Sequence, residues 1–162
     1  MAVYSVTMQN QTVVADATLV IIHTDSTLAS AGSNIRILRA WAGQQASETS
    51  DQLGVMIALK ASAFGTYTST TPINHFPGGA TSLVGGTAGA EGTCGTDASA
   101  EGAGTVTPII YDGFNNLNGW LWVPTPEERI RVPIDTAIIL KIVGTPAALG
   151  NWSAGMTYEE VN

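Results

Sequence analysis

The sequence predicts an all-β protein, a single-domain antiparallel jelly roll or β-sandwich that covers residues 1–162. Apolar and β-branched residues recur in about nine short stretches that have the period of a strand. Clusters rich in Asp, Asn, Gly and Ser, such as HTDST and YDGFNNLNG, separate these stretches. We find no convincing amphipathic helix, and many short strands with loop-rich connections are typical of sandwiches and jelly rolls.

The first part of the chain contains four predicted strands, at residues 3–8, 12–22, 34–41 and 53–60. The first alternates between polar and apolar residues, and the second is β-branched and apolar. In the third, Ile35 and Ile37 share one side with Arg39 as a further candidate, opposite Arg36 and Leu38. The fourth is a nearly continuous apolar run, which is typical of a strand buried on both faces or at a subunit contact.

Five more strands are predicted further along, at residues 105–111, 119–123, 128–132, 136–143 and 154–161. The stretch 128–132 alternates cleanly, so Arg129 and Arg131 project to one face of it. The stretch 136–143 is a second buried-looking apolar run. Turn clusters separate the later strands in the same way as the earlier ones.

Residues 78–104 break this pattern, because they hold nine of the eighteen glycines and no aromatic residue. Such a segment cannot bury enough side chain to offset the entropy of ordering it alone. It is therefore predicted to be a long Gly-rich insertion, either a mobile loop or an arm that orders against a neighbour. Leu83 and Val84 are the apolar residues that would anchor such an arm.

The charge composition excludes several kinds of partner. The net charge is −7, charged residues make up 12%, and no Lys or Arg lies between Lys60 and Arg129. Nucleic-acid binding needs clustered cations, so DNA and RNA are excluded as direct partners, and an anionic membrane surface is disfavoured for the same reason. So little charge also predicts that neighbours cover much of the surface, or that Thr, Ser, Asn and Gly coat it. No secretory signal and no apolar run of about 20 residues are found, so we expect synthesis in the cytoplasm.

No catalytic, cofactor or metal site is expected. The pair His23 and Asp25 could ligate a metal, as in a cupin-like enzyme, but it reads more simply as a polar turn after an apolar strand. Cys94 is the only cysteine, and nearby acids suppress its thiolate. No activated nucleophile is found, and the adjacent acids Glu127 and Glu128, like Glu159 and Glu160, would point to opposite faces of a strand and cannot form a catalytic dyad by themselves. The chain is therefore predicted not to be an enzyme.

The segment from Trp120 to Val132 carries the candidate partner site. Trp120 and Trp122 share one face of a strand, where they form either a core or subunit seam, or an exposed row that stacks on sugars. Arg129 and Arg131 would bind carboxylates of a partner, and the acidic loop is one candidate mate. That loop contains Glu91, Asp97 and Glu101. The alternative for both arginines is a solvated face of little energetic value.

The layout of the chain resembles a known family. The opening MAVYSVTMQNQTV, the pair NIRILRAWAGQ and LGVMIALK, the Gly-rich middle, the stretch GWLWVPTPEERIRV and the closing WSAGMTYEE are similar to the small β-sandwich proteins encoded in the head-gene regions of tailed bacteriophages. Those proteins act as capsid decoration, or cement, proteins. The most specific part of the resemblance runs from Trp120 to Val132, with one extra residue in its Pro-to-Arg spacing.

The resemblance implies a jelly-roll-like fold, a homotrimer, and docking on the outside of a phage head at local threefold positions. The expected partners are copies of this chain and the major capsid protein, and the expected location is the virion exterior. No catalytic residue is carried over. The alternative is a carbohydrate-binding or host-adhesion module of a phage particle, based on Trp120, Trp122 and the Asn- and Asp-containing loop 112–118.

Overall fold

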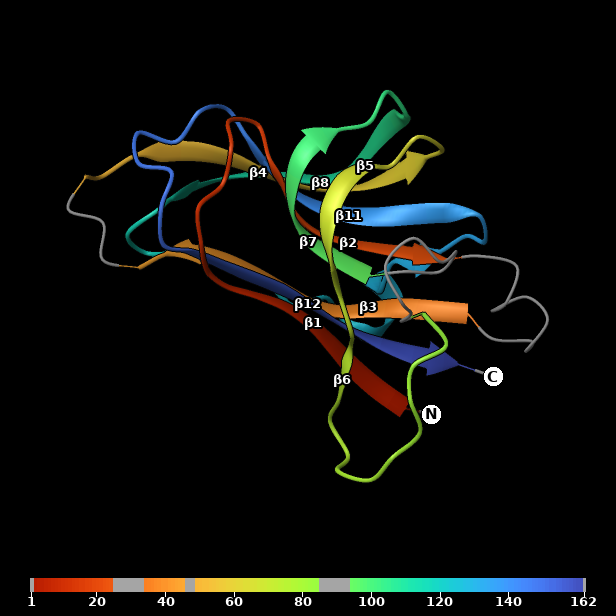
Figure 1. Ribbon diagram of the computed structural model, residues 1–162. Helices are drawn as coiled ribbons and strands as arrows, with labels where there is room; N and C mark the ends of the chain where they lie inside the picture. Colours follow the sequence, from red (N-terminus) through yellow and green to blue (C-terminus); the bar gives the residue numbers. More distant parts are fainter. Residues whose placement is uncertain (1, 25–33, 46–48, 85–93, 162) are drawn as a thin grey trace.

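The computed structural model describes residues 2–24, 34–45, 49–84 and 94–161. Within them lie twelve strands and one short 3₁₀ helix, η1 (Pro126–Glu128). The strands form two sheets, and every pairing between strands is antiparallel (Figure 1). The predicted all-β sandwich is thereby confirmed, whereas its finer classification as a jelly roll stays a prediction. No helix among the described residues has the length and apolar character needed to cross a bilayer.

Sheet A has the strand order β10-β3-β12-β1-β6, with β9 also paired to β3. Its strands are β10 (Arg131–Val132), β3 (Asn34–Gln44), β12 (Trp152–Val161), β1 (Ala2–Gln11), β6 (Ile73–Asn74) and β9 (Trp120–Trp122). Sheet B has the order β5-β7-β2-β11-β4-β8. Its strands are β5 (Gly65–Thr70), β7 (Cys94–Glu101), β2 (Thr18–Thr24), β11 (Thr136–Val143), β4 (Gln52–Ala61) and β8 (Thr105–Asn115).

Two predicted strands begin several residues later than predicted. The strand predicted at 12–22 begins only at Thr18, because Asp16 has a φ of 57° and receives a hydrogen bond from Gly144 N at 3.0 Å, which makes a turn. The strand predicted at 128–132 shrinks to Arg131–Val132, because Pro126 starts a 3₁₀ turn capped by Thr125. Neither turn can be predicted from the alternation of polar and apolar residues.

A β-bulge in β3 changes which side chains point inward. Ile37 lies opposite Tyr158 and Arg39 lies opposite Thr157, so Leu38 is the extra residue. The inward set therefore passes from Ile35 and Ile37 to Ala40 and Ala42. The prediction that Arg39 shares a side with Ile35 and Ile37 is wrong, and Arg39 is exposed on the outer face of sheet A.

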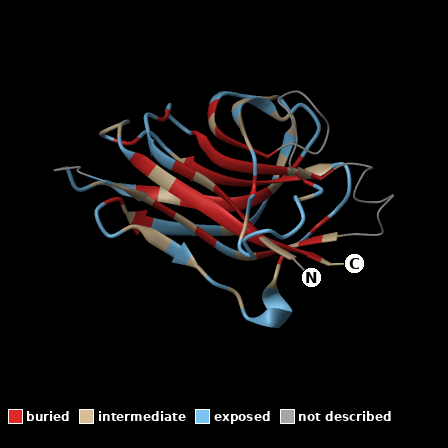
Figure 2. Cartoon of the chain, turned by 60° about the horizontal axis from the view of Figure 1, so that its bottom comes forward, coloured by how far each residue is buried: buried red, intermediate tan, exposed pale blue. Residues whose placement is uncertain are grey.

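The main core lies between the two sheets, and buried residues run along the facing strands in Figure 2. Its largest side chains include Tyr4 and Tyr158, whose rings stack with centroids 5.6 Å apart. Trp152 is also fully buried, and its indole Nε1 donates to the carbonyl of Ala148 at 3.1 Å. Each of these aromatic side chains removes a large apolar area from water, so this layer supplies most of the driving force for folding.

A second, smaller core covers the other face of sheet B. Its buried members are Ile21, Met56, Ala58, Ala137 and Ile139, and Phe64, Tyr67, Val106 and Val143 pack against them. The apolar runs 53–60 and 136–143 are therefore buried on both faces within one chain. Of the two explanations that the sequence left open, burial by a partner is not needed for these strands.

This second core exists because a long two-stranded ribbon bends back over the sheet. β4 pairs with β8, and after the turns at residues 62–64 and 102–104 the same two stretches of chain continue as β5 paired with β7. β7 pairs with β2 only from Cys94 to Thr96, and Asp97, with a φ of 53°, then turns it away. The end of β7 thus crosses the outer face of β4 and β11, as the curled upper layer of Figure 1 shows.

Residues 78–104 were predicted as a Gly-rich insertion, either a mobile loop or an arm that orders against a neighbour, but residues 94–101 form β7, a regular strand of sheet B. The small residues of this strand leave space for large side chains on neighbouring strands. A Cβ at Gly95, for example, would stand 1.9 Å from the ring of Tyr67. Order in this strand comes from pairing with β2 and β5, which lie far away in the sequence. Residues 85–93, with Glu91, lie outside the described residues.

Candidate functional site

The two tryptophans of the predicted partner site lie on the inner face of β9. β9 pairs with β3 so that Trp120 lies opposite Ala42 and Trp122 opposite Ala40. Both alanines belong to the main core, and their small side chains leave room for the indole rings, which are half-buried against it. Trp120 and Trp122 therefore share a face, but this face is a core seam and does not present an exposed row of rings.

Trp120 also closes one side of the sandwich. Its indole Nε1 donates to Asp112 Oδ2 at 3.1 Å, and Asp112 lies on β8, the edge strand of sheet B. This contact joins the free edges of the two sheets. It uses Asp112, a member of the loop that the alternative prediction assigned to sugar binding, for a contact within the fold.

The outward residues of this segment are apolar and exposed. Leu121 is 63% exposed and Val123 is 62% exposed. Leu121 lies opposite Trp41 on the outer face of sheet A, so Trp41 extends this apolar surface onto β3. Two prolines follow, Pro124 and Pro126, and proline cannot donate a ladder hydrogen bond. We call Leu121 and Val123 the β9 face. It is suited to packing of side chains and poorly suited to sheet extension.

Arg129 and Arg131 do not act as a pair. Arg129 contacts Glu159 with its guanidinium 3.4 Å from Oε1, and Arg36 approaches the same oxygen at 3.7 Å. The Glu159 side chain is only 3% exposed, so two arginines offset the cost of burying it. Arg131 is exposed and has no ion pair among the described residues. Arg129 therefore has a partner on its own chain, on β12, and Glu101 of the acidic loop is engaged elsewhere.

The proposed anchors of the Gly-rich segment contact the chain's own sheet A. Val84 is fully buried in the main core, whereas Leu83 is 38% exposed. Glu160 Oε1 accepts hydrogen bonds from Leu83 N at 2.8 Å and from Ser82 Oγ at 2.5 Å. Cys94 Sγ donates to the carbonyl of Val84 at 3.0 Å. These bonds hold residues 82–84 against β12, which leaves Leu83 but not Val84 available to a partner.

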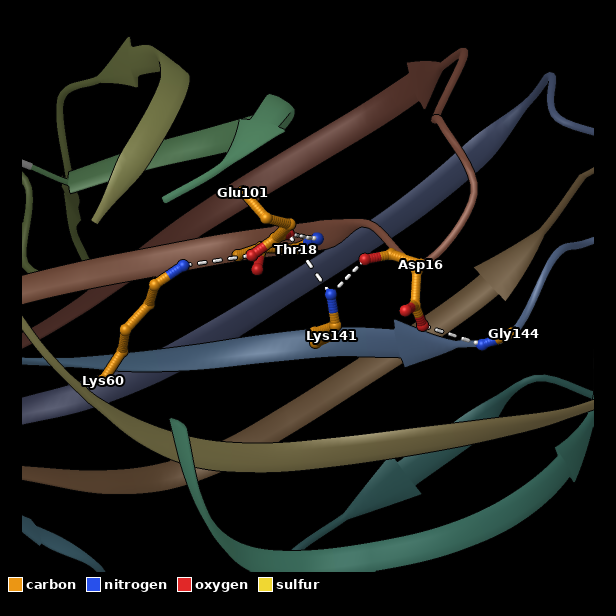
Figure 3. Close-up of polar contacts among 6 residues, drawn as sticks. All are labelled: Asp16, Thr18, Lys60, Glu101, Lys141 and Gly144. Atoms are coloured by element: carbon orange, nitrogen blue, oxygen red, sulfur yellow. Dashed lines mark hydrogen bonds and ion pairs between the residues drawn. The ribbon is translucent and has the colours of Figure 1, made fainter. Parts of the chain in front are cut away.

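Glu101 forms a polar network that sequence reasoning missed (Figure 3). The chain has two lysines, and both reach this carboxylate: Lys60 Nζ lies 3.1 Å from Oε2 and Lys141 Nζ lies 3.5 Å from Oε1. The backbone N–H of Thr18 donates to Oε1 at 2.6 Å, and Lys141 also donates to the carbonyl of Asp16. Two lysines in apolar runs of a charge-poor chain are the signal that could have predicted a buried counter-ion.

The network is best understood as a structural clamp. Burial acts to raise the pKa of Glu101, but hydrogen bonds from Thr18 and Lys60 and the charge of Lys141 outweigh it and hold the pKa below its ordinary value. The carboxylate is thus ionised and its neighbours are cations, which suits charge pairing and does not suit a general base. It ties β7 to β2, β4 and β11 and so closes the second core.

The other reactive side chains also have structural surroundings. Burial raises the pKa of the Cys94 thiol well above its ordinary value, so burial, rather than the neighbouring acids, is the main cause. The His23 ring packs on Phe64 with centroids 4.2 Å apart, and Asp25 lies outside the described residues. His75 Nε2 and Ser5 Oγ are 2.7 Å apart. Among the described residues, no group of three His, Cys, Asp or Glu side chains could hold a metal ion.

Comparisons with protein-family models, with curated proteins and with solved structures found no match to this chain.

Proposed function

We propose that this chain is a virion structural protein, a capsid decoration protein that binds the outside of a phage head and stabilises it without catalysis. It acts as a homotrimer and contacts the major capsid protein. The layout resemblance of the sequence supports this proposal. The structural observation that carries it is the β9 face, where Leu121 on β9 and Val123 directly after it stand more than 60% exposed inside the most specific part of that resemblance.

The energetics fit attachment through many weak contacts. Burying an exposed Leu or Val side chain contributes roughly 1.5–3 kcal/mol, so one β9 face alone binds weakly. A trimer presents three such faces at once, and their combined attachment is much tighter than that of one. Because two prolines disfavour strand addition at this edge, a partner is contacted through side chains.

The β9 face provides the test. The double variant Leu121→Asp with Val123→Asp places charges on this surface, and we expect it to dissociate the trimer or abolish binding to heads that lack the protein. The matched control is Ile73→Asp on β6, because Ile73 is 62% exposed on a different edge of sheet A. Light scattering after size exclusion measures the assembly, and sedimentation with purified heads measures the binding.

The proposal also makes a prediction for the wild-type protein. It should form trimers or bind heads, and bound protein should raise the melting temperature of the particle. A wild-type chain that stays monomeric and leaves heads unchanged would contradict the decoration role. An intact trimer in the β9 double variant, with normal head binding, would contradict the role of the β9 face.

A further inference from the structure

The outer face of sheet A carries a trough that adjoins the β9 face at Leu121. Two adjoining hollows of about 470 and 460 Å³ share Trp41, Gln45 and Ser153. One hollow extends toward Asn118 and Leu121 beside β9, and the other toward Gln9 on β1. Together they cross β1, β12, β3 and β9, a span of about 14 Å at the usual strand spacing. We call this the outer-face trough. It is long enough for a short oligosaccharide.

Trp41 lies flat in this trough, and the sheet has a specific place for its ring. Trp41 is directly opposite Gly155 on β12. A Cβ at Gly155 would stand 2.1 Å from Trp41 Cζ2, so only glycine lets the indole rest against the backbone. The guanidinium of exposed Arg39 lies over the ring, 4.7 Å from its centroid, on a long side chain that can move aside. The fold therefore holds a partly exposed indole ring against the backbone of β12.

The lining around this platform is polar but uncharged. Neither hollow is lined by an ionisable side chain. Gln9, Gln45 and Asn118 are exposed, and their side chains make no hydrogen bond among the described residues. An amide offers two donors and one acceptor oxygen, which matches the alternating donors and acceptors of sugar hydroxyls. In a chain with a net charge of −7, a lining without ionisable side chains, over which only Arg39 reaches, is a distinct local feature.

We propose that the outer-face trough binds a neutral saccharide. The apolar C–H face of one sugar ring packs on Trp41, because the face of an aromatic ring is negative and attracts C–H groups. The free amides of Gln45, Asn118 and Gln9 bind the hydroxyls of that ring and of its neighbours. The site is centred on Trp41 and not on the row predicted at Trp120 and Trp122, although Trp120 and residues 116–118 line its first hollow. It does not depend on the capsid role, and the two are tested separately.

The binding test uses the full chain. It is titrated by calorimetry and by tryptophan fluorescence with cellohexaose, maltohexaose, xylohexaose and chitohexaose, and with hexagalacturonate as an acidic arm. We expect saturable binding of at least one neutral oligosaccharide, with an affinity that salt does not change. Trp41→Ala should weaken it by about tenfold. The control is Tyr111→Ala, which removes an aromatic side chain 63% exposed on β8, outside the trough, and should leave the affinity unchanged.

Two further variants separate a binding role from a structural one. Gly155→Ala keeps every side chain that is proposed to contact the sugar but displaces the indole ring of Trp41 from the backbone of β12. It should therefore weaken binding and shift the tryptophan emission. Gln45→Ala with Asn118→Ala changes only exposed side chains and should weaken binding at an unchanged melting temperature. The proposal is overturned if no neutral oligosaccharide binds, if Trp41→Ala binds as wild type does, or if only hexagalacturonate binds and salt abolishes it.

Discussion

The buried cationic side chains of this protein depend on individual carboxylates, and Glu101 is the clearest case. Lys60 is only 1% exposed, and its ammonium depends on this one carboxylate for a counter-ion. Lys141 has a second acceptor in the carbonyl of Asp16. A buried charge that loses its partner costs several kcal/mol, so the residue that pairs with Lys60 has more influence on stability than its own partial exposure suggests.

We therefore expect Glu101→Gln to lower the free energy of unfolding by about 3 kcal/mol. The amide keeps the shape of the side chain but leaves Lys60 and Lys141 without a negative partner. Urea unfolding followed by circular dichroism measures the change. Glu128→Gln is the control, since Glu128 is an exposed glutamate of η1 and its loss should cost less than 1 kcal/mol. Equal stabilities of the two variants would show that the clamp has no energetic role.

The pH dependence follows from the lowered pKa of Glu101. The unfolded chain binds this proton more readily than the folded chain, so the stabilisation is complete above the ordinary carboxyl pKa of 4.5. It is lost as the pH falls below that value toward the lower folded pKa. Wild type should thus lose more stability than Glu101→Gln between pH 5 and pH 3. Parallel curves over this range would contradict the assignment.

At the scale of elements, the bend of the β4–β8 ribbon creates the second core. Its turns approach each other very closely: a Cβ at Gly102 would stand 1.7 Å from the carbonyl oxygen of Ala63. Gly65, on the other turn, has a φ of 97°, a conformation that other residues rarely adopt. Backbone packs against backbone here, and no side chain could yield to make room.

Gly102→Ala should therefore destabilise the protein by about 2–3 kcal/mol, because the bend must open to admit a methyl group. Gly113→Ala on β8 is the matched control: the nearest atom to its Cβ is Leu53 O at 4.0 Å, an ordinary contact. Thermal melts of both variants provide the comparison. If the bend matters as described, only Gly102→Ala lowers the melting temperature, and an unaffected Gly102→Ala would refute the role given to this turn.

At the scale of the whole molecule, most of the few basic side chains form ion pairs within the chain. Of the six basic residues, Lys60 and Lys141 meet Glu101, and Arg36 and Arg129 meet Glu159. Arg39 and Arg131 have no ion pair among the described residues.

This arrangement predicts that the native protein resists amine and thiol reagents. Lys60 and Cys94 are buried, and Lys141 is 9% exposed, so none of them should react until the fold opens. Acetylation with a hydroxysuccinimide ester and alkylation with iodoacetamide, each read by peptide mass spectrometry, measure this. Both reactions should begin at the denaturant concentration at which circular dichroism reports unfolding. Labelling of Lys60 in the native protein would contradict the described packing.

The candidate sites show which features could be predicted from neighbouring residues in the sequence. The period of two placed Trp120 and Trp122 on one face, and the prolines marked the end of their strand, since both signals depend on neighbouring residues. The sequence did not reveal that this face turns inward, because that depends on Ala40 and Ala42 across the sheet. Trp41 was not singled out as a site, because its exposure depends on Gly155, more than a hundred positions away in the sequence.

By itself, the sequence determined the all-β class, most strand positions, the scarcity of cations and the apolar character of β4 and β11. Alternation, turn residues and composition are local properties, and a chain displays them before it folds. The tertiary structure alone decided that Cys94–Glu101 is a strand, that both lysines share one carboxylate, and which aromatic ring faces solvent. Each of these depends on pairing between distant stretches, where packing and hydrogen bonding outweigh local preference.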